Sequence, residues 1–192
     1  MTTIGNKLQL VRARIAQACD KSHRKPADVR LLAVSKTFGA DVVREAAALG
    51  QRAFGENYIQ EAVAKIEALS GLGLEWHCIG PVQSNKSRLV AQHFDWVHTV
   101  DRLKLAQRLS EQRAEDMAAL NVCLQVNIDA GATKSGMTPE AALDLARTVA
   151  RLPRLRLRGL MTIPDPAEGF DAQCAVHAPA KALFDTVRAG LD

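Results

Sequence analysis

Cysteine is scarce in this sequence, and the few cysteines are far apart. Cys19, Cys78, Cys123 and Cys174 form no Cys-x-x-Cys pair. A small disulfide-stabilised domain needs a dense framework of cysteines, and the common structural zinc sites use closely spaced cysteines. The sequence therefore excludes a disulfide scaffold and favours reduced thiols.

Metal-ligand spacing is absent as well. The five histidines are His23, His77, His93, His98 and His177, and no His-Glu-x-x-His pattern occurs among them. Tetrahedral zinc needs ligands that are clustered. We therefore expect no metal site.

Long apolar runs are also missing. Lys7, Arg12 and Arg14 interrupt the apolar residues near the N-terminus, whereas a secretory signal peptide needs an uninterrupted apolar segment there. No stretch has the length and apolar character of a membrane span. We expect a cytoplasmic protein with no membrane partner.

A strong charge of one sign is lacking too. The formal net charge is +4, which is too small to indicate binding to the phosphates of a nucleic acid. The densest basic segment, residues 147–158, runs from a predicted helix end into a predicted strand and has no aromatic residues on which bases could stack. A solvated rim is the better interpretation, so we expect no nucleic-acid partner.

The sequence does contain regular apolar patterns. Near the N-terminus, apolar residues recur at helical spacing, namely Ile4, Leu8, Val11, Ile15 and Cys19. This stripe predicts an amphipathic helix over residues 3–19, with Thr2 or Thr3 as its cap. The next apolar run, Leu31–Val34, is short and continuous, which is typical of a strand covered on both faces in a parallel sheet.

Helices and strands then alternate. Further strands are predicted at residues 52–55, 74–79, 96–100, 122–128 and 155–161. Helices are predicted at residues 42–49, 58–69, 84–93 and 103–113. Pro139 is expected in the first turn of the next helix, and Pro179 is expected to open the last one.

Six strands separated by helices predict right-handed βαβ crossovers. A doubly wound sheet and a (β/α)8 barrel both fit this pattern. No Gly-x-Gly-x-x-Gly follows the first strand, which disfavours a dinucleotide-binding sheet. The α/β pattern favours a TIM-type barrel that has six of its eight strands, as a single domain over residues 1–192.

Polar residues stand repeatedly where predicted strands end. The polar residues are Ser35, Lys36, Glu56, Asn57, His77, Asn127, Asp129 and Thr162, and the apolar Met161 stands at the same kind of position. In both candidate architectures, ligands bind at the C-terminal ends of the strands. The sequence therefore predicts that several of these side chains line one pocket.

Lys36 is the sharpest candidate among them. A lysine at the mouth of a buried strand is expected to be partly desolvated, so that its pKa falls and its neutral amine can attack an aldehyde. Pyridoxal 5′-phosphate (PLP) supplies such an aldehyde. The alternative is a solvated lysine whose stem packs on the surface, and position alone leaves both readings open.

The other candidates also have two readings. Asn57 and Tyr58 follow Gly55 at a βα turn, where Asn57 could face a ligand or cap the next helix. His77 could contact a cofactor ring or be a hydrogen-bonded core residue. Lys134 lies in the loop after the fifth strand, where it could close over a pocket or stay solvated.

Six short motifs together resemble the pyridoxal phosphate homeostasis proteins. They are Ala33-Val34-Ser35-Lys36-Thr37, Phe54-Gly55-Glu56-Asn57-Tyr58, Trp76-His77-Cys78-Ile79-Gly80-Pro81, Gln83-Ser84-Asn85-Lys86, Lys134-Ser135-Gly136-Met137 and Arg158-Gly159-Leu160-Met161. The match spans nearly the whole chain. Several motifs in the right order and at the right strand ends are far more specific than any one of them.

The resemblance implies the PLP-binding barrel of the alanine racemase N-terminal domain, with the cofactor held as a Schiff base on Lys36. It places Asn57 and His77 in the pocket, and it implicates Tyr58 and Lys134 in cofactor handling. Met161, at the end of the sixth predicted strand, is a further candidate for cofactor binding. It implies a role in vitamin B6 homeostasis without a defined catalytic reaction, with PLP-dependent apoenzymes as recipients. Some relatives have a second lysine shortly after the first, where this sequence has Phe38, so no role of that lysine is expected.

The resemblance also implies two further strands, whose segments hold the PLP phosphate, beyond residue 192. On that basis we expect weak retention of PLP, and self-association through exposed strand edges. Two alternatives stay open at this point. One is a PLP-dependent amino-acid racemase or lyase, and the other is a fragment unable to retain PLP.

Overall fold

The structure is a computed structural model that describes residues 3–129, 131 and 134–191. The chain divides into two compact units, Met1–Trp76 and His77–Asp192. Strand β3 (Glu75–Cys78) contains the boundary between them. The prediction of a single domain stays a prediction.

The first unit alternates helices with parallel strands. Its elements are α1 (Ile4–Lys21), the 3-10 helix η1 (Pro26–Asp28), β1 (Ala33–Val34), α2 (Ala40–Ala48), β2 (Ala53–Glu56) and α3 (Ile59–Ala68), followed by the start of β3. Strands β1 and β2 are parallel, with Val34 opposite Gly55. The Glu75 amide donates to the Arg52 carbonyl at 2.8 Å, which joins the start of β3 to β2.

Helix α1 forms as its apolar stripe predicts. The Thr3 hydroxyl accepts a hydrogen bond from the Asn6 amide at 3.3 Å and so caps the helix. The five stripe residues, from Ile4 to Cys19, are among the less exposed residues of α1, and Cys19 is fully buried. The predicted cap and the predicted buried face are both confirmed.

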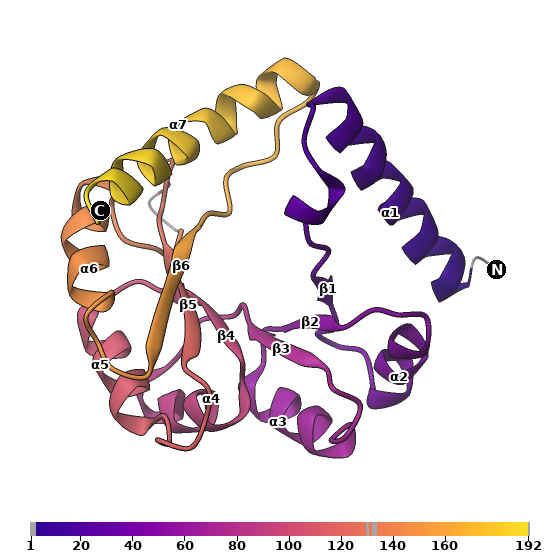
Figure 1. Cartoon of the computed structure of the whole chain (residues 1–192), viewed down its shortest axis with the longest axis horizontal. Coiled ribbons are helices and arrows are strands. Elements are labelled where there is room, and N and C mark those ends of the chain that lie inside the picture. The colour runs from indigo at the N-terminus through magenta and orange to yellow at the C-terminus, as the bar shows by residue number, and fades with distance from the viewer. Residues whose placement is uncertain (1–2, 130, 132–133, 192) are drawn as a thin grey trace. The chain divides into compact units, whose positions relative to one another are not determined.

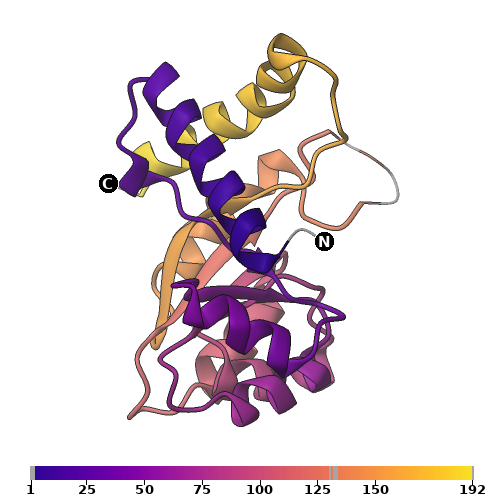
Figure 2. The same cartoon turned by 90° about the vertical axis from the view of Figure 1, so that its right-hand side faces the viewer.

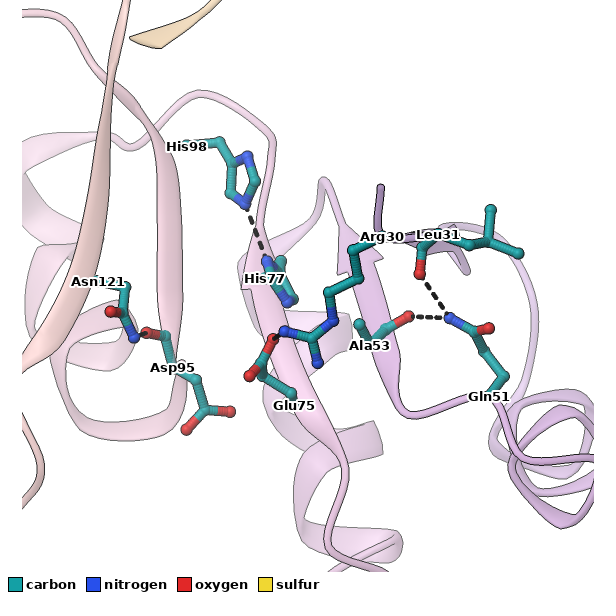
Figure 3. Close-up of polar contacts among 9 residues, drawn as sticks. All are labelled: Arg30, Leu31, Gln51, Ala53, Glu75, His77, Asp95, His98 and Asn121. Carbon is teal, nitrogen blue, oxygen red and sulfur yellow. Dashed lines mark hydrogen bonds and ion pairs between the residues drawn. The ribbon is translucent and has the colours of Figure 1, made fainter. Parts of the chain in front are cut away.

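The buried Gln51 side chain ties together the starts of β1 and β2. Its Nε2 donates to the Leu31 carbonyl at 2.9 Å and to the Ala53 carbonyl at 2.8 Å (Figure 3). Nearby, Arg30 forms an ion pair of 2.7 Å with Glu75. The prediction of strand from Leu31 was wrong by two residues, because the Leu31 carbonyl bonds to this side chain and β1 begins at Ala33.

The second unit repeats the alternation. After β3 it contains η2 (Ser84–Lys86), α4 (Ser87–His93), β4 (Trp96–Val100), α5 (Leu103–Gln112), β5 (Leu120–Gln125), η3 (Pro139–Ala141), α6 (Ala142–Val149), β6 (Leu155–Met161) and α7 (Phe170–Ala189). The strands lie in the order β3-β4-β5-β6, and every neighbouring pair is parallel. The predicted parallel α/β sheet is confirmed.

Helices α4, α5 and α6 cover one face of these strands (Figure 1). On the strands, Val97, Val122 and Leu124 are fully buried, and the helices contribute Leu105, Leu109 and other residues that are equally buried. Alternate strand residues point to opposite faces of a sheet. The other face therefore presents the residues between them, including His77, Trp96 and His98.

Helix α7 begins earlier than predicted. Pro179 lies inside it and does not open it. The less exposed residues, Val176, Ala180, Leu183, Phe184 and Val187, recur at helical spacing on both sides of the proline. A stripe that continues across Pro179 explains why the helix tolerates a residue that usually breaks one. An extended segment connects β6 to α7 (Figures 1 and 2).

No helix among the described residues is both long enough and apolar enough to cross a membrane.

Arg113 organises the loops beside α4 and α5. It is only 4% exposed, and its Nη1 donates to the carbonyls of Ala91 at 2.7 Å and Phe94 at 2.8 Å. Its Nε donates to the Ala118 carbonyl at 2.9 Å. Burial lowers the pKa of this guanidinium. One side chain thus satisfies three backbone acceptors, among them the carbonyl of Phe94 at the C-terminal cap of α4.

Replacement of Arg113 is expected to weaken the second unit. Arg113→Ala leaves three carbonyls without their donor and should cost about 3 kcal/mol of unfolding free energy, as measured by urea unfolding followed by tryptophan fluorescence. The matched control is Arg88→Ala on the exposed side of α4, which should change stability by less than about 0.5 kcal/mol. Equal effects of the two substitutions would contradict this role of Arg113.

Candidate functional site

Lys36 and Asn57 follow neighbouring strands at the same edge of the first unit. Val34 of β1 lies opposite Gly55 of β2. Lys36 is two residues after Val34, and Asn57 is two residues after Gly55. The Ser35 amide donates to the Gly55 carbonyl at 2.9 Å and extends the pairing past the end of β1. The structure therefore brings Lys36 and Asn57 together at the C-terminal ends of β1 and β2, where ligands bind in parallel α/β folds.

Lys36 lies in a tight turn. The Phe38 amide donates to the Ser35 carbonyl at 3.1 Å, so Lys36 and Thr37 are the two central residues. Thr37 has a φ of 67°. Positive φ is uncommon for any residue with a Cβ and is strained for a β-branched one. Strain of this kind is found at ligand sites, where the surrounding structure holds it.

The exposure of Lys36 differs from the expectation of a partly desolvated amine. Its side chain is exposed, and within the described residues it makes no hydrogen bond and no ion pair. The expectation rested on burial at the mouth of β1, but the turn carries Lys36 beyond the end of the strand. The amine is therefore accessible to a ligand from solvent.

A buried polar cluster lies beside the turn. We call Ser35, Glu56 and Lys65 the Glu56 cluster. The Glu56 carboxylate, 1% exposed, accepts hydrogen bonds through Oε1 from Ser35 Oγ at 2.6 Å and from Lys65 Nζ at 2.8 Å. Lys65 Nζ also donates to the Ser35 carbonyl at 2.8 Å. A buried charge needs a partner of opposite charge, and Lys65 provides it.

Two buried acceptors at this edge have no donor among the described residues. They are Glu56 Oε2 and Asn57 Oδ1. The cap residue of α3 is Tyr58, which makes no side-chain cap bond and is 53% exposed. The alternative reading of Asn57 as a helix cap was therefore wrong. Buried acceptors normally have partners, so this pair of atoms points to a donor from outside the described residues.

His77 lies on β3 in the second unit, buried against another histidine. Its Nδ1 is 2.9 Å from Nε2 of His98 on β4 (Figure 3). Its ring also stacks on Trp96, with 5.3 Å between the ring centroids and 15° between the planes. The arrangement is that of a hydrogen-bonded histidine inside a sheet face. A contact of His77 with a cofactor stays a prediction.

Lys134 is held between two acidic side chains. It forms ion pairs with Asp129, which follows β5, and with Asp165, which follows β6, the second at 2.8 Å. Hydrogen bonds to both carboxylates raise the pKa of Lys134. The bond from Lys134 lowers the pKa of Asp129, and a bond from the Asp165 amide at 2.9 Å adds to this. Lys134 is thus a paired ammonium and neither free nor poised as a nucleophile.

Gly136 keeps the Lys134 loop close to β5. The Met137 amide donates to the Gln125 carbonyl, and the Asn127 amide donates to the Met137 carbonyl, each at 2.9 Å. Gly136 has a φ of 119°, and a Cβ there would lie 2.7 Å from the Asn127 nitrogen. Only glycine fits this approach of two backbone segments.

Met161 ends β6 directly opposite Gln125 of β5. Its carbonyl accepts a hydrogen bond of 2.9 Å from the Val126 amide. The residue is half-buried at the C-terminal end of the strand. Its position agrees with the prediction that it follows a strand, and its contact with a cofactor stays a prediction.

The predicted residues are thus distributed over both units. Lys36, Asn57 and Tyr58 belong to the first unit, and His77, Lys134 and Met161 belong to the second. Sequence reasoning missed Lys65 and His98. Lys65 lies on the buried face of α3 with Ile59 and Ala62. A lysine at helical spacing from these apolar residues was the signal in the sequence that could have identified it. His98 had no signal beyond its place in a strand.

The model of the family described as alanine racemase, N-terminal domain, matches residues 7–192. A pyridoxal phosphate homeostasis protein from Pseudomonas aeruginosa is 55% identical over 192 residues, which is 100% of this chain and 84% of that protein. A second protein of that name, from Escherichia coli, is 51% identical over 187 residues, which is 96% of this chain and 80% of that protein.

Solved structures agree with this similarity. PipY of Synechococcus elongatus, with PLP bound, is 35% identical, with a TM-score of 0.74 over 91% of this chain and 82% of that one. An alanine racemase from E. faecalis is 22% identical, with a TM-score of 0.66 over 94% of this chain and 49% of that one. The second likeness shows the fold alone. The predicted barrel-type fold of the alanine racemase N-terminal domain is confirmed.

The pairing of Lys134 is expected to suppress its reactivity. A raised pKa leaves less neutral amine at any given pH, so acetic anhydride should label Lys134 faster in Asp129→Asn and in Asp165→Asn than in the parent protein. Peptide mass spectrometry at pH 8 measures this. Lys104, an exposed lysine on α5, is the internal control and should be labelled at one rate throughout. Unchanged labelling of Lys134 would show that the two carboxylates do not control it.

Replacement of Gly136 is expected to displace the Lys134 loop. Gly136→Ala places a Cβ against backbone and should cost about 2 to 4 kcal/mol in urea unfolding. Gly71 also has positive φ, 87°, but a Cβ there would meet nothing within 4 Å. Gly71→Ala should therefore cost only about 1 kcal/mol. A Gly136→Ala protein as stable as Gly71→Ala would contradict the close approach.

Proposed function

Because the chain belongs to the pyridoxal phosphate homeostasis proteins, within the alanine racemase N-terminal domain family, we propose that it binds PLP through a Schiff base on Lys36. Its role is in intracellular PLP homeostasis and not in a defined catalytic reaction. A relative of solved structure, PipY, has PLP bound. PLP is therefore the cofactor of this chain as well.

The placement of Lys36 carries the proposal. Its amine is exposed, has no partner among the described residues, and lies at the C-terminal end of β1 in a turn strained at Thr37. Exposure gives an aldehyde access to the amine. A strained residue held at a strand end is the local arrangement expected of a ligand site.

The residues of the first unit fit such a ligand. Lys36 Nζ would hold PLP, and the cofactor would supply the aldehyde with which this amine condenses, with loss of water. Asn57 has a buried Oδ1 that lacks a donor within the part of the chain that the structure describes, and it follows the neighbouring strand at the level of Lys36. Asn57 would bind a polar group of the ligand, and the exposed Tyr58 ring would lie at the rim.

Residues of the second unit are assigned to the same cofactor by the family resemblance. His77 and Met161 would contribute to the pocket, and Lys134 would take part in cofactor handling. Its ion pairs with Asp129 and Asp165 keep Lys134 protonated, so its amine does not compete with Lys36 for the aldehyde.

An exposed Schiff-base lysine suits a carrier. A bond that solvent can reach forms and hydrolyses readily, so PLP can be taken up and released again. PLP-dependent apoenzymes are the proposed recipients, because they need the cofactor as a free aldehyde. The same exposure disfavours a catalytic site, which excludes water from a reactive carbanion.

The proposal is tested by trapping the covalent bond. Borohydride reduction after incubation with PLP should leave a pyridoxyl group on the peptide that contains Lys36, detected by mass mapping. Lys36→Ala should lose this adduct and the visible absorbance band of the bound cofactor. Lys104→Ala removes an exposed lysine elsewhere and should keep both.

The opposite result would be equally clear. If excess PLP gives no adduct on Lys36, or gives adducts spread evenly over exposed lysines, the site is elsewhere. Retention of the absorbance band in Lys36→Ala would have the same meaning.

A further inference from the structure

Ser35 is the first residue of the turn that contains Lys36, and its carbonyl is the acceptor that closes the turn. It accepts the turn hydrogen bond from the Phe38 amide at 3.1 Å and a second bond from Lys65 Nζ at 2.8 Å. The first bond closes the turn, and the second ties it to α3. The peptide that precedes Lys36 is therefore held by a charged group from another element.

Ser35 is fixed in two further ways. Its amide donates to the Gly55 carbonyl of β2, and its hydroxyl donates to Glu56 Oε1 at 2.6 Å. Amide, hydroxyl and carbonyl each have a partner, and two of these partners belong to β2. A residue held by all of its polar groups leaves the following peptide little freedom.

The strain at Thr37 needs such support. A threonine at a φ of 67° would relax toward negative φ in a free loop. Strained conformations persist only where the surrounding structure over-determines them. The bonds of the Glu56 cluster meet this requirement at Ser35, two residues before the strained Thr37.

Stability alone gives a weak reason for a buried ion pair here. Removing both charges from water is costly, and well-packed apolar residues usually stabilise a fold equally well. Glu56 Oε2 also remains without a donor among the described residues. The specific gain from the Lys65–Glu56 pair is geometry, because Lys65 Nζ bonds Glu56 Oε1 and the Ser35 carbonyl at the same time.

We propose that Ser35, Glu56 and Lys65 are positioning residues, which hold the Lys36 turn in the conformation that presents the amine to PLP. The inference rests on the proposed function and adds residues that the cofactor need not touch. Loss of the cluster would leave Lys36 able to react but would let the turn relax. A less well-oriented amine condenses more slowly.

The sharpest test compares two buried serines. Ser35→Ala removes the hydroxyl bond to Glu56. Ser110, a buried serine on α5 of the second unit, donates through Oγ to the Pro153 carbonyl at the same distance, 2.6 Å, and Ser110→Ala removes that bond. With PLP in excess, the absorbance band should appear about tenfold more slowly in Ser35→Ala than in Ser110→Ala or the parent protein. Ser35→Thr keeps a hydroxyl and should restore the rate.

A second variant removes the charges together. Glu56→Gln with Lys65→Met leaves no unpaired buried charge, so the protein should stay folded by circular dichroism. It should nevertheless form the adduct more slowly and lose it faster on dilution, with Lys36 still the trapped residue. The thermal unfolding midpoint without PLP separates this effect from a general loss of stability.

The outcomes are distinguishable. If the parent protein forms no adduct on Lys36, the proposed function fails. If the parent does so but Ser35→Ala reacts as fast as Ser110→Ala, only the positioning role is overturned. Equal slowing in both serine variants, in proportion to their unfolding midpoints, would also overturn it, because it would reflect stability alone.

Discussion

A buried ion pair between Lys65 and Glu56 connects α3 to the ends of β1 and β2. Because both charges are away from water, each must keep its partner, and the geometry of the pair is narrowly defined. Both members of the pair also bond to Ser35: Glu56 Oε1 accepts a hydrogen bond from its hydroxyl, and Lys65 Nζ donates one to its carbonyl. The conformation of the exposed turn that carries Lys36 thus depends on a contact in the interior.

Two lysines of the predicted site have opposite electrostatic surroundings. Lys36 is exposed and without a partner among the described residues, whereas Lys134 is shared between Asp129 and Asp165. The carboxylates raise the pKa of Lys134 and keep its charge. One amine is therefore available for bond formation, and the other stays a protonated, ion-paired ammonium. Both residues are lysines, so the neighbouring side chains decide which amine can react.

Much of the fold follows from apolar periodicity. The stripe of α1, its Thr3 cap and the alternation of helices with parallel strands were all predicted, because burial needs one face of a helix and both faces of a parallel strand. Errors arose where a single side chain changed the local bonding. The Gln51 side chain donates to the Leu31 carbonyl, and β1 begins two residues later than predicted. At Pro179 the prediction failed for another reason, because the packed face of α7 continues on both sides of the proline that was expected to begin the helix.

The sequence by itself determined the family, the alternation of strands with helices and the lysine that follows β1, since motif order and periodicity are properties of the chain alone. Tertiary structure decided what surrounds each group. It exposed Lys36, brought Lys65 under the turn and set His98 against His77. Those contacts join residues from different elements, and spacing along the chain carries no information about which side chains meet across a sheet or between a helix and a strand end.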